Sequence, residues 1–144
     1  MSFLLDTSVV SEPTRPQPSE AVLDWIAAQP VGSLFISVIT IGELRRGALL
    51  LAAGKKRKAL LHWIEADIQT DFDGRIVPID TAVMECWAQL QTASEQRGKR
   101  LPMMDSLLAA SALAHGLTLV TRNTADFKSA NVPLLDPWRG ADGS

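Results

Sequence analysis

Acidic residues follow or interrupt apolar segments at several points of this 144-residue chain. Asp6 directly follows a short apolar run, and Asp126 comes a few residues after another. Glu43 lies in a mostly apolar helical row, and Asp105 lies one turn into the most apolar helical segment. If these carboxylates meet at one crevice, they repel each other unless a cation lies among them. Oxygen ligands without a histidine cluster suit Mg²⁺ or Mn²⁺ rather than zinc.

Three of these residues also have an ordinary structural explanation. Asp6 could cap a helix or form an Asx-turn. Asp105 could be a first-turn acid that the helix dipole favours, and Asp126 could begin a short helix. Taken one at a time, none of the three identifies a site.

Glu43 has fewer alternatives. No basic residue lies four positions later, although Arg46 at the third position could pair with it at the surface. Gly47, one turn beyond Glu43, costs about 1 kcal/mol relative to Ala in a helix interior. We expect a close approach of another group over Glu43 to explain this glycine.

Other catalytic patterns are missing from the sequence. No G-x-S-x-G motif occurs, and Gly54-Lys55 lacks the flanking residues of a P-loop. His62 and His115 stand alone at helical positions, where packing or a surface role is expected. The single Cys86 excludes an internal disulfide and a multi-cysteine zinc site.

The composition indicates one folded domain. The length suits a single domain, and 47% hydrophobic residues exclude a wholly disordered chain. A net charge of −2 provides no global field for nucleic acid, so any such contact needs a local basic patch. The start lacks a basic n-region, and no run of about 18 apolar residues occurs. We therefore expect a cytoplasmic protein without membrane contact.

Basic residues lie beside the acidic ones in the sequence. Arg45 and Arg46 follow one acidic candidate, and Lys99 and Arg100 precede the segment of another. We predict that these residues contact the phosphates of a polyanionic strand. The basic run 55–58 is more simply explained as a solvated helix turn.

Apolar runs alternate with helical segments along the chain. The predicted strands span 3–5, 34–38, 75–79 and 117–121, with 132–135 as an edge strand. The predicted helices span 20–29, 39–53, 55–70, 81–97 and 102–115. Ser19 and Asp80 are predicted as N-caps, and Gly98 and Gly116 are predicted to stop the helices before them. Continuously apolar strands indicate a mainly parallel sheet covered on both faces, a three-layer α/β/α fold. Its functional crevice is expected beyond the carboxyl ends of the strands. We assign residues 1–138 to one domain and 139–144 to a short tail.

With these residues in place, the chain resembles the PIN-domain family, and within it the VapC-like toxins of bacterial toxin–antitoxin pairs. The resemblance covers roughly residues 3–138. It rests on LLDTSVVSE at 4–12, ISVITIGEL at 36–44, MDSLLAA at 104–110 and VTRNTADF at 120–127. As an ordered set, these motifs are highly specific.

The resemblance implies a single PIN-like nuclease domain that hydrolyses RNA phosphodiester bonds with Mg²⁺, for which Mn²⁺ can substitute. Asp6, Glu43 and Asp105 match three acidic positions of the family. The fourth is often Asp, but Asn123 stands there and Asp126 follows three residues later. This departure leaves open whether one or two metal ions bind.

The resemblance also implies roles for these residues. Asp6 and Asp105 would ligate the ion directly, and Glu43 would hold it through water or orient the nucleophile. Hydroxyls at Thr7, Thr40 or Thr121 could hydrogen-bond these carboxylates. The substrate would be single-stranded or structured RNA.

The implied partners are a VapB-like antitoxin and a second copy of the chain. We expect the antitoxin to cover an apolar groove beside the helices at 39–53 and 55–70. Two other functions stay open at this point. A haloacid-dehalogenase-type phosphatase would need a second Asp where Ser8 stands. A catalytically weak PIN-fold module that binds RNA or protein is compatible with Asn123.

Overall fold

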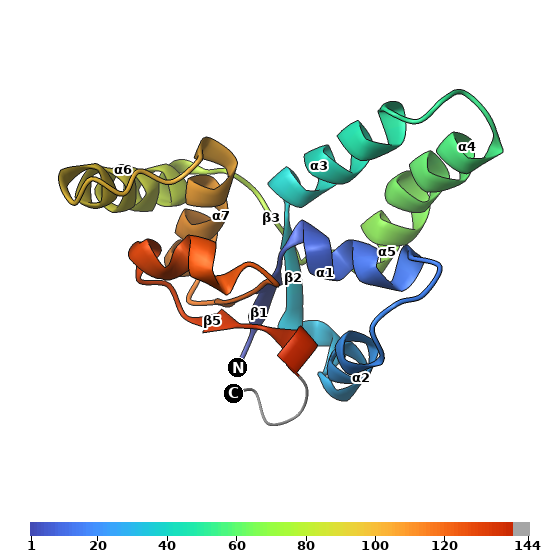
Figure 1. The fold of residues 1–144 in the computed structure, drawn as a ribbon, viewed down its shortest axis with the longest axis horizontal. Coiled ribbons are helices and arrows are strands. Elements are labelled where there is room, and N and C mark those ends of the chain that lie inside the picture. Colours follow the sequence, from blue (N-terminus) through green and yellow to red (C-terminus); the bar gives the residue numbers. More distant parts are fainter. Residues whose placement is uncertain (140–144) are drawn as a thin grey trace.

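The predicted strands form, and each pairs in parallel with its neighbour. They are β1 (Phe3–Leu5), β2 (Leu34–Ser37), β3 (Ile76–Val77), β4 (Thr118–Val120) and β5 (Leu134–Leu135). The computed structural model, which describes residues 1–139, orders them β3-β2-β1-β4-β5 (Figure 1). Helices cover both faces of this sheet, which confirms the three-layer α/β/α prediction.

The helical elements connect these strands. The α-helices are α1 (Thr7–Ser11), α2 (Glu20–Ala28), α3 (Val38–Leu49), α4 (Lys55–His62), α5 (Gln69–Asp71), α6 (Thr81–Gln96) and α7 (Met103–Ala114). A π-helix, η3 (Trp63–Ile68), joins α4 to α5, and short 3-10 helices are η1 (Glu12–Thr14), η2 (Val31–Ser33), η4 (Thr124–Ala130) and η5 (Pro137–Arg139). Residues 140–144, most of the predicted tail, lie outside the described residues.

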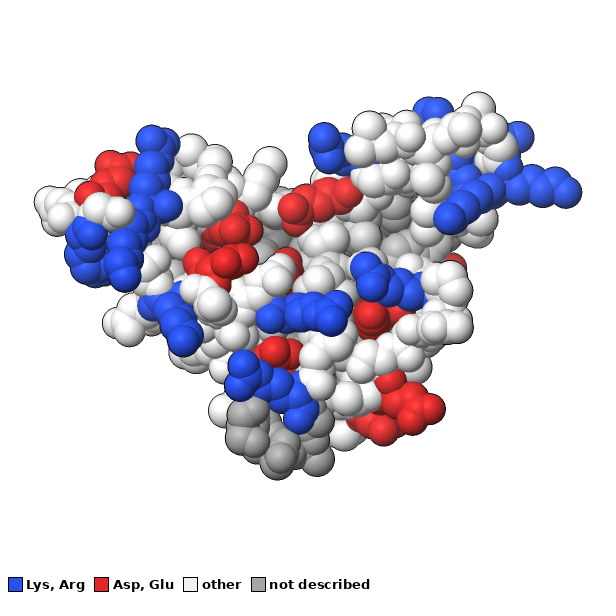
Figure 2. Space-filling model, in the orientation of Figure 1, with Lys and Arg blue, Asp and Glu red and all other residues white. Residues whose placement is uncertain are grey.

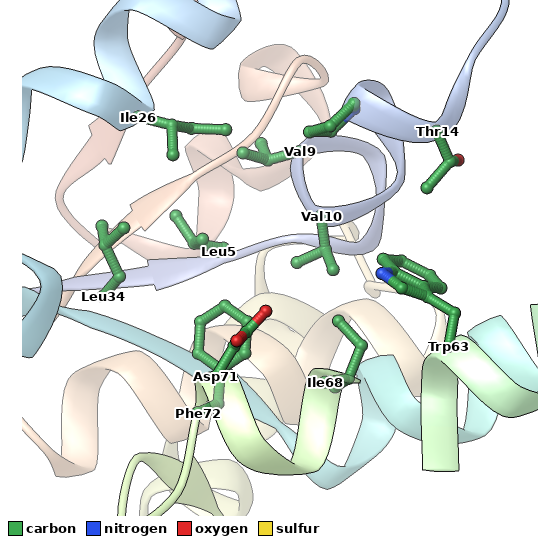
Figure 3. A pocket seen from close by; sticks show the side chains of 11 residues that line it. Leu5, Val9, Val10, Thr14, Ile26, Leu34, Trp63, Ile68, Asp71 and Phe72 are labelled. Atoms are coloured by element: carbon green, nitrogen blue, oxygen red, sulfur yellow. The ribbon is translucent and has the colours of Figure 1, made fainter. Parts of the chain in front are cut away.

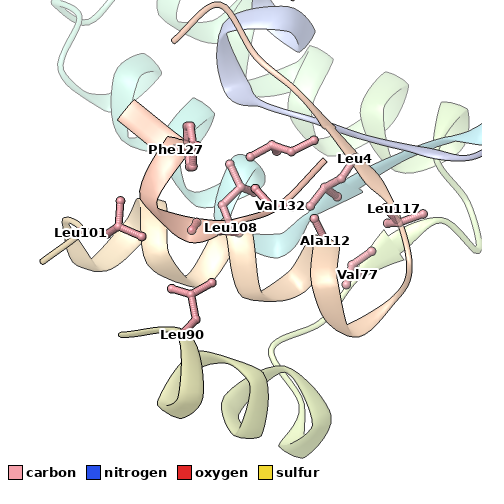
Figure 4. Packing of buried hydrophobic residues seen from close by; sticks show 12 residues of the cluster. Leu4, Val77, Leu90, Leu101, Leu108, Ala112, Leu117, Phe127 and Val132 are labelled. Atoms are coloured by element: carbon pink, nitrogen blue, oxygen red, sulfur yellow. The ribbon is translucent and has the colours of Figure 1, made fainter. Parts of the chain in front are cut away.

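Each face of the sheet has its own apolar core. Successive side chains of a strand point to opposite faces, so Leu4 joins one cluster while Phe3 and Leu5 join the other. The first cluster packs against α6, α7 and η4, as Figure 4 shows for Leu108 and Phe127. Continuously apolar strands follow directly from this two-sided burial.

The predicted boundaries hold best where a cap fixes them. Ser19 accepts from the backbone N of Val22, and Asp80 accepts from that of Val83, so both cap helices as predicted. Gly98 and Gly116, predicted to stop α6 and α7, have φ values of 71° and 62°. Glycine adopts this left-handed conformation without a Cβ clash, which favours it just past a helix end.

Several predicted ranges differ from the structure. The helix at 39–53 ends at Leu49, and the helix at 55–70 contains the π-helix η3, a wider turn that apolar periodicity does not reveal. The strand at 75–79 shrinks to β3 because Pro78 has no N–H to donate to a neighbouring strand. The Arg75 side chain instead donates to the backbone carbonyls of Leu34 and Asp71.

Two groups of helices flank the carboxyl ends of the strands. The helices α3 and α4 form an arm on one side, whereas α6, α7 and η4 form the other side (Figure 1). Figure 2 shows the surface hollowed between them, with carboxylates inside the hollow. None of the described helices combines the length and apolar character needed to cross a membrane.

Candidate active site

Asp6 is fixed between the two central strands. Its backbone N donates to Val120 O at 2.9 Å, which ties the end of β1 to the end of β4. One carboxylate oxygen, Oδ2, accepts from Thr121 Oγ1 at 2.7 Å and from Ser8 Oγ at 3.0 Å. The other, Oδ1, accepts from the backbone N of Thr7 at 2.8 Å and so caps α1. Asp6 is therefore both a helix cap and a precisely oriented carboxylate at the strand end.

Glu43 reaches the same edge from α3 and is held by a threonine. The hydroxyl Oγ1 of Thr7 donates to Glu43 Oε1 at 2.6 Å and lies 3.4 Å from Thr40 Oγ1. Because Thr7 directly follows Asp6, one hydroxyl links the α3 carboxylate to the end of β1. Among residues 1–139, neither Glu43 nor Arg46 forms an ion pair, so the predicted surface pair between them is not present.

Asp105 lies half-buried in the first turn of α7. Burial raises the pKa of its carboxyl above the ordinary value, because the charged form loses hydration. The negative charges of Asp6, Asp126 and Glu43 raise the pKa of Asp105 further, in that order. The four acidic side chains therefore share one electrostatic environment.

Asn123 and Asp126 belong to the segment that follows β4. The backbone N of Asn123 donates to Thr121 Oγ1 at 3.1 Å, and Asp126 N donates to Asn123 O at 3.0 Å. Both side chains are exposed, and Asp126 lies in the first turn of η4. The short helix expected at Asp126 is present, and it also places this carboxylate where it acts on Asp105.

The acidic side chains face one another without a neutralising partner. Among residues 1–139, none of these four carboxylates pairs with Lys, Arg or His, and no three His, Cys, Asp or Glu side chains form a ready group for a metal ion. Like charges at close range disfavour full convergence. Carboxylate oxygens with uncompensated charge are nevertheless the donor set that Mg²⁺ and Mn²⁺ prefer, so the residues fit such an ion.

The structure separates the predicted basic residues. We call the four carboxylates Asp6, Glu43, Asp105 and Asp126 the acidic edge. Arg46 lines a surface groove with Glu43 and Met104, so it lies beside the acidic edge. Arg45 instead pairs with Glu65 at 3.1 Å.

On the opposite side, Arg100 pairs with Glu95 at 3.7 Å, while Lys99 lines a separate basic pocket. Arg46 is therefore the only one of the four predicted contacts that the described structure brings to a carboxylate of the site.

Two expectations about individual residues change. A Cβ placed on Gly47 would meet nothing within 4 Å, so the predicted close approach over Glu43 was wrong. Ser8, which stands where a haloacid-dehalogenase-type phosphatase would need an Asp, donates to Asp6 Oδ2. A hydroxyl two residues after a strand-end Asp is a usable signal for this contact, because an Asx-type turn brings the two side chains together.

Comparison with known proteins defines the family. The PIN domain model matches residues 3–132. The toxin FitB of Neisseria gonorrhoeae is 42% identical over 136 residues, covering 94% of this chain and 98% of FitB. VapC ribonuclease Y4jK of Sinorhizobium fredii is 36% identical over 139 residues, covering 96% and 99%. The structure of FitAB bound to the IR36 DNA fragment superposes with a TM-score of 0.89 at 40% identity, covering 94% and 95%.

The chain belongs to the PIN-domain family. Its similarity to FitB and to a VapC ribonuclease confirms the predicted class, a toxin-type nuclease. The same similarity contradicts the phosphatase alternative.

Proposed function

We propose that this chain is a metal-dependent endoribonuclease that hydrolyses RNA phosphodiester bonds as the toxin of a toxin–antitoxin pair. The observation that carries the proposal is the grouping of carboxylates at one edge of the sheet: Asp6 is fixed at the end of β1, Thr7 beside it holds Glu43, and Asp105 and Asp126 lie close enough for their charges to interact. The similarity to a VapC ribonuclease supports RNA as the substrate. Such a toxin acts where RNA is, in the cytoplasm.

We assign Mg²⁺, with Mn²⁺ as a substitute, to this edge. Asp6 and Asp105 are the direct ligands in the proposal, and Glu43 holds the ion through water or orients the attacking water. A bound divalent ion lowers the pKa of a bound water and neutralises charge on the phosphate. Asn123 contributes no charge, so Asp126 supplies the fourth carboxylate in our assignment.

The chain's own hydrogen bonds orient these groups. Thr121 and Ser8 both donate to Asp6 Oδ2, which fixes the plane of that carboxylate. Thr7 donates to Glu43 Oε1 and so fixes the Glu43 side chain on the arm. Such partners of a metal-binding carboxylate set its orientation and basicity.

Cleavage of single-stranded and hairpin RNA by the purified chain tests the proposal. We expect cleavage with Mg²⁺ or Mn²⁺, none in excess chelator, and recovery on adding the ion back. Full activity in chelator would contradict the metal dependence. RNA binding without cleavage under every metal condition would instead favour the weak binding module, since Asn123 replaces an acid.

We propose that an antitoxin segment occupies an apolar cavity of about 350 Å³ beside the arm. Figure 3 shows Val9, Val10 and Ile26 facing Trp63 and Ile68 across it. These residues come from α1, α2 and η3, so the cavity lies beside the second of the two predicted helices, and no residue of the first lines it. An amphipathic helix inserting apolar side chains is the usual occupant of such a groove.

We also propose a homodimer through the amino-terminal ends of α3 and α7. Val38, Met103 and Met104 are 40%, 48% and 55% exposed, although all three are apolar. Val38 and Met104 line one shared groove, so they form a continuous apolar patch. Light scattering should give the mass of a dimer, and replacing Met103 and Met104 by Gln should give a monomer. A wild-type monomer at high concentration contradicts this proposal.

A further inference from the structure

A cluster of basic side chains lies outside the acidic edge, on the side of the hollow that α6, α7 and η4 form. Arg97, Lys99 and Lys128 line a pocket of about 360 Å³ together with Ser129 and Asn131. All three cationic side chains are exposed, and within residues 1–139 none of them pairs with a carboxylate. We call these five residues the basic pocket.

The basic pocket is built from two segments that are distant in sequence. Arg97 and Lys99 lie at the end of α6 and just beyond it, whereas the other residues lie in or just after η4. The Arg97 guanidinium donates through Nη2 to the carbonyl oxygen of Ser129 and so joins the segments. Asn131, at φ 55°, turns the chain after η4. Backbone geometry therefore holds like charges side by side, which favours an anionic ligand.

The 3-10 helix η4 connects the basic pocket to the acidic edge. In η4, Asp126 belongs to the edge, and Lys128 and Ser129 belong to the pocket. A 3-10 helix rises about 2 Å per residue, so Lys128 and Ser129 lie roughly 4–6 Å beyond Asp126 along its axis. At about 3.4 Å of helix axis per phosphate in a stacked strand, this is roughly one or two nucleotides. Figure 2 shows basic side chains at this side of the molecule on the face that carries the carboxylates.

We propose that the basic pocket binds a backbone phosphate of the RNA strand, roughly one or two nucleotides from the scissile phosphate. The inference rests on the proposed ribonuclease function and deepens it. Every lining residue is polar or charged, which matches a phosphodiester. The pocket holds the strand, while the acidic edge carries out the hydrolysis.

The test compares two pairs of lysine substitutions. The pocket pair is Lys99→Gln with Lys128→Gln, and the control pair is Lys55→Gln with Lys56→Gln on the exposed start of α4. Both pairs remove two positive charges, and Arg97 stays in place because it links the segments. Anisotropy of a fluorescent single-stranded RNA is measured in chelator over a range of salt, so no cleavage is needed.

We expect the pocket pair to weaken RNA binding roughly tenfold and to lower the slope of log K against log salt by about 0.7, the value for one lost phosphate contact. The control pair should change neither quantity. Equal slopes for wild type and the pocket pair, or equal losses in both pairs, overturn the inference. Unchanged RNA binding with weaker capture of an antitoxin would assign the pocket to an acidic protein segment instead.

Cleavage assays separate this inference from the proposed function. With Mg²⁺, the pocket pair should raise KM for a long RNA and leave turnover of a dinucleotide unchanged, because a dinucleotide cannot reach the pocket. Equal losses on both substrates would show a structural defect and overturn the inference. A wild type that cleaves no RNA contradicts the proposed function, while the salt slopes still decide whether the pocket binds phosphate.

Discussion

The two sides of the hollow are the arm (α3 and α4) and the α6–α7 wall, and they are attached to the rest of the domain in different ways. On the α6–α7 wall, Trp87 Nε1 donates to Ser106 Oγ at 2.9 Å, and the Gln91 side chain both donates to and accepts from the backbone of Leu101. On the arm, α4 has no buried residue among those described, and Arg45 pairs with Glu65 near the surface. The α6–α7 wall is therefore part of the core, whereas the arm is anchored by Ile39, Thr40 and Ala48 of α3 and its outer helix α4 is not buried.

This difference assigns different tasks to the acidic residues. Asp105 lies on a helix that core packing immobilises, so its position is set when the domain folds. Glu43 lies on the arm, where the hydrogen bond from Thr7 fixes its side chain. Elements with few buried contacts open at lower free energy than core elements. We therefore expect metal and substrate to adjust the arm rather than the α6–α7 wall.

The largest effect should come from the packed wall. Leu108 is 2% exposed, and Leu108→Ala should lower the free energy of unfolding by about 2–5 kcal/mol, because the cavity cannot collapse fully. Leu50, on the arm, is 69% exposed, and Leu50→Ala should cost less than about 0.5 kcal/mol. Urea unfolding of both variants measures the contrast. Similar losses would show that the arm is as tightly integrated as α7.

The next effect tests the hydroxyl that fixes the arm carboxylate. Thr7→Val keeps the side-chain shape but removes the donor to Glu43, and should reduce metal-dependent cleavage roughly tenfold to a hundredfold. Stability should fall by less than about 1 kcal/mol. Thr70→Val, at an exposed position of α5, is the matched control. Unchanged cleavage in Thr7→Val would remove Thr7 from the account.

A smaller effect concerns how the charge of Asp105, on α7, changes the stability of the metal-free protein. Because the folded-state pKa of Asp105 is raised, the unfolded chain releases this proton at lower pH than the folded one. Metal-free stability contributed by Asp105 is therefore lost as pH rises from its unfolded pKa to its folded pKa. Asp105 is only half-buried, so solvent screening limits the regained stability to at most about 1 kcal/mol. The metal-free Asp105→Asn variant should therefore melt at most roughly 2–4 °C higher than wild type at neutral pH.

Melting curves in chelator across this pH range measure that difference. The advantage of Asp105→Asn over wild type should grow with pH across the interval and then stay constant. A difference that does not change with pH, or a less stable variant at neutral pH, would contradict the repulsion that the structure indicates.

The smallest effect tests the arm alone. A Cβ at Gly47 meets open space, and its helix has ordinary backbone angles there, so Gly47→Ala should stabilise the protein by about 0.5–1 kcal/mol. Cleavage should not change, because Gly47 touches no carboxylate of the site. Thermal melting and an RNA cleavage assay together check this. Destabilisation would indicate that another molecule packs closely on α3.

Much of the fold follows from local sequence signals. Apolar runs without alternation predicted a parallel sheet buried on both faces, and Ser19 and Asp80 marked helix starts through their caps. The π-helix at Trp63–Ile68 could not be predicted, because its apolar spacing is that of an ordinary helix. The short β3 depends on Pro78, whose missing N–H ends the strand inside an otherwise apolar run.

The sequence indicates which acidic residues come together, but it indicates only some of the hydroxyl groups that hydrogen-bond to them. A strand end indicated Asp6, apolar helical rows indicated Glu43 and Asp105, and the family resemblance joined the three into one set. Contacts between distant segments decide the rest: Arg45 turns to Glu65, and Lys128 joins Lys99 in the basic pocket. Sequence proximity to a carboxylate did not reveal either arrangement, since helix faces and loop paths determine them.

The most direct test of the central claim is a thermal melt of wild type and Asp6→Asn, each in chelator and with Mg²⁺, beside an RNA cleavage assay. If the acidic edge holds the catalytic ion, Mg²⁺ raises the melting temperature of wild type, because the ion binds the folded state, and it has little effect on the variant. Asp6→Asn should lose cleavage while keeping its fold, because Asn caps a helix about as well as Asp. Equal stabilisation of both proteins by Mg²⁺, with cleavage intact in Asp6→Asn, would contradict the account.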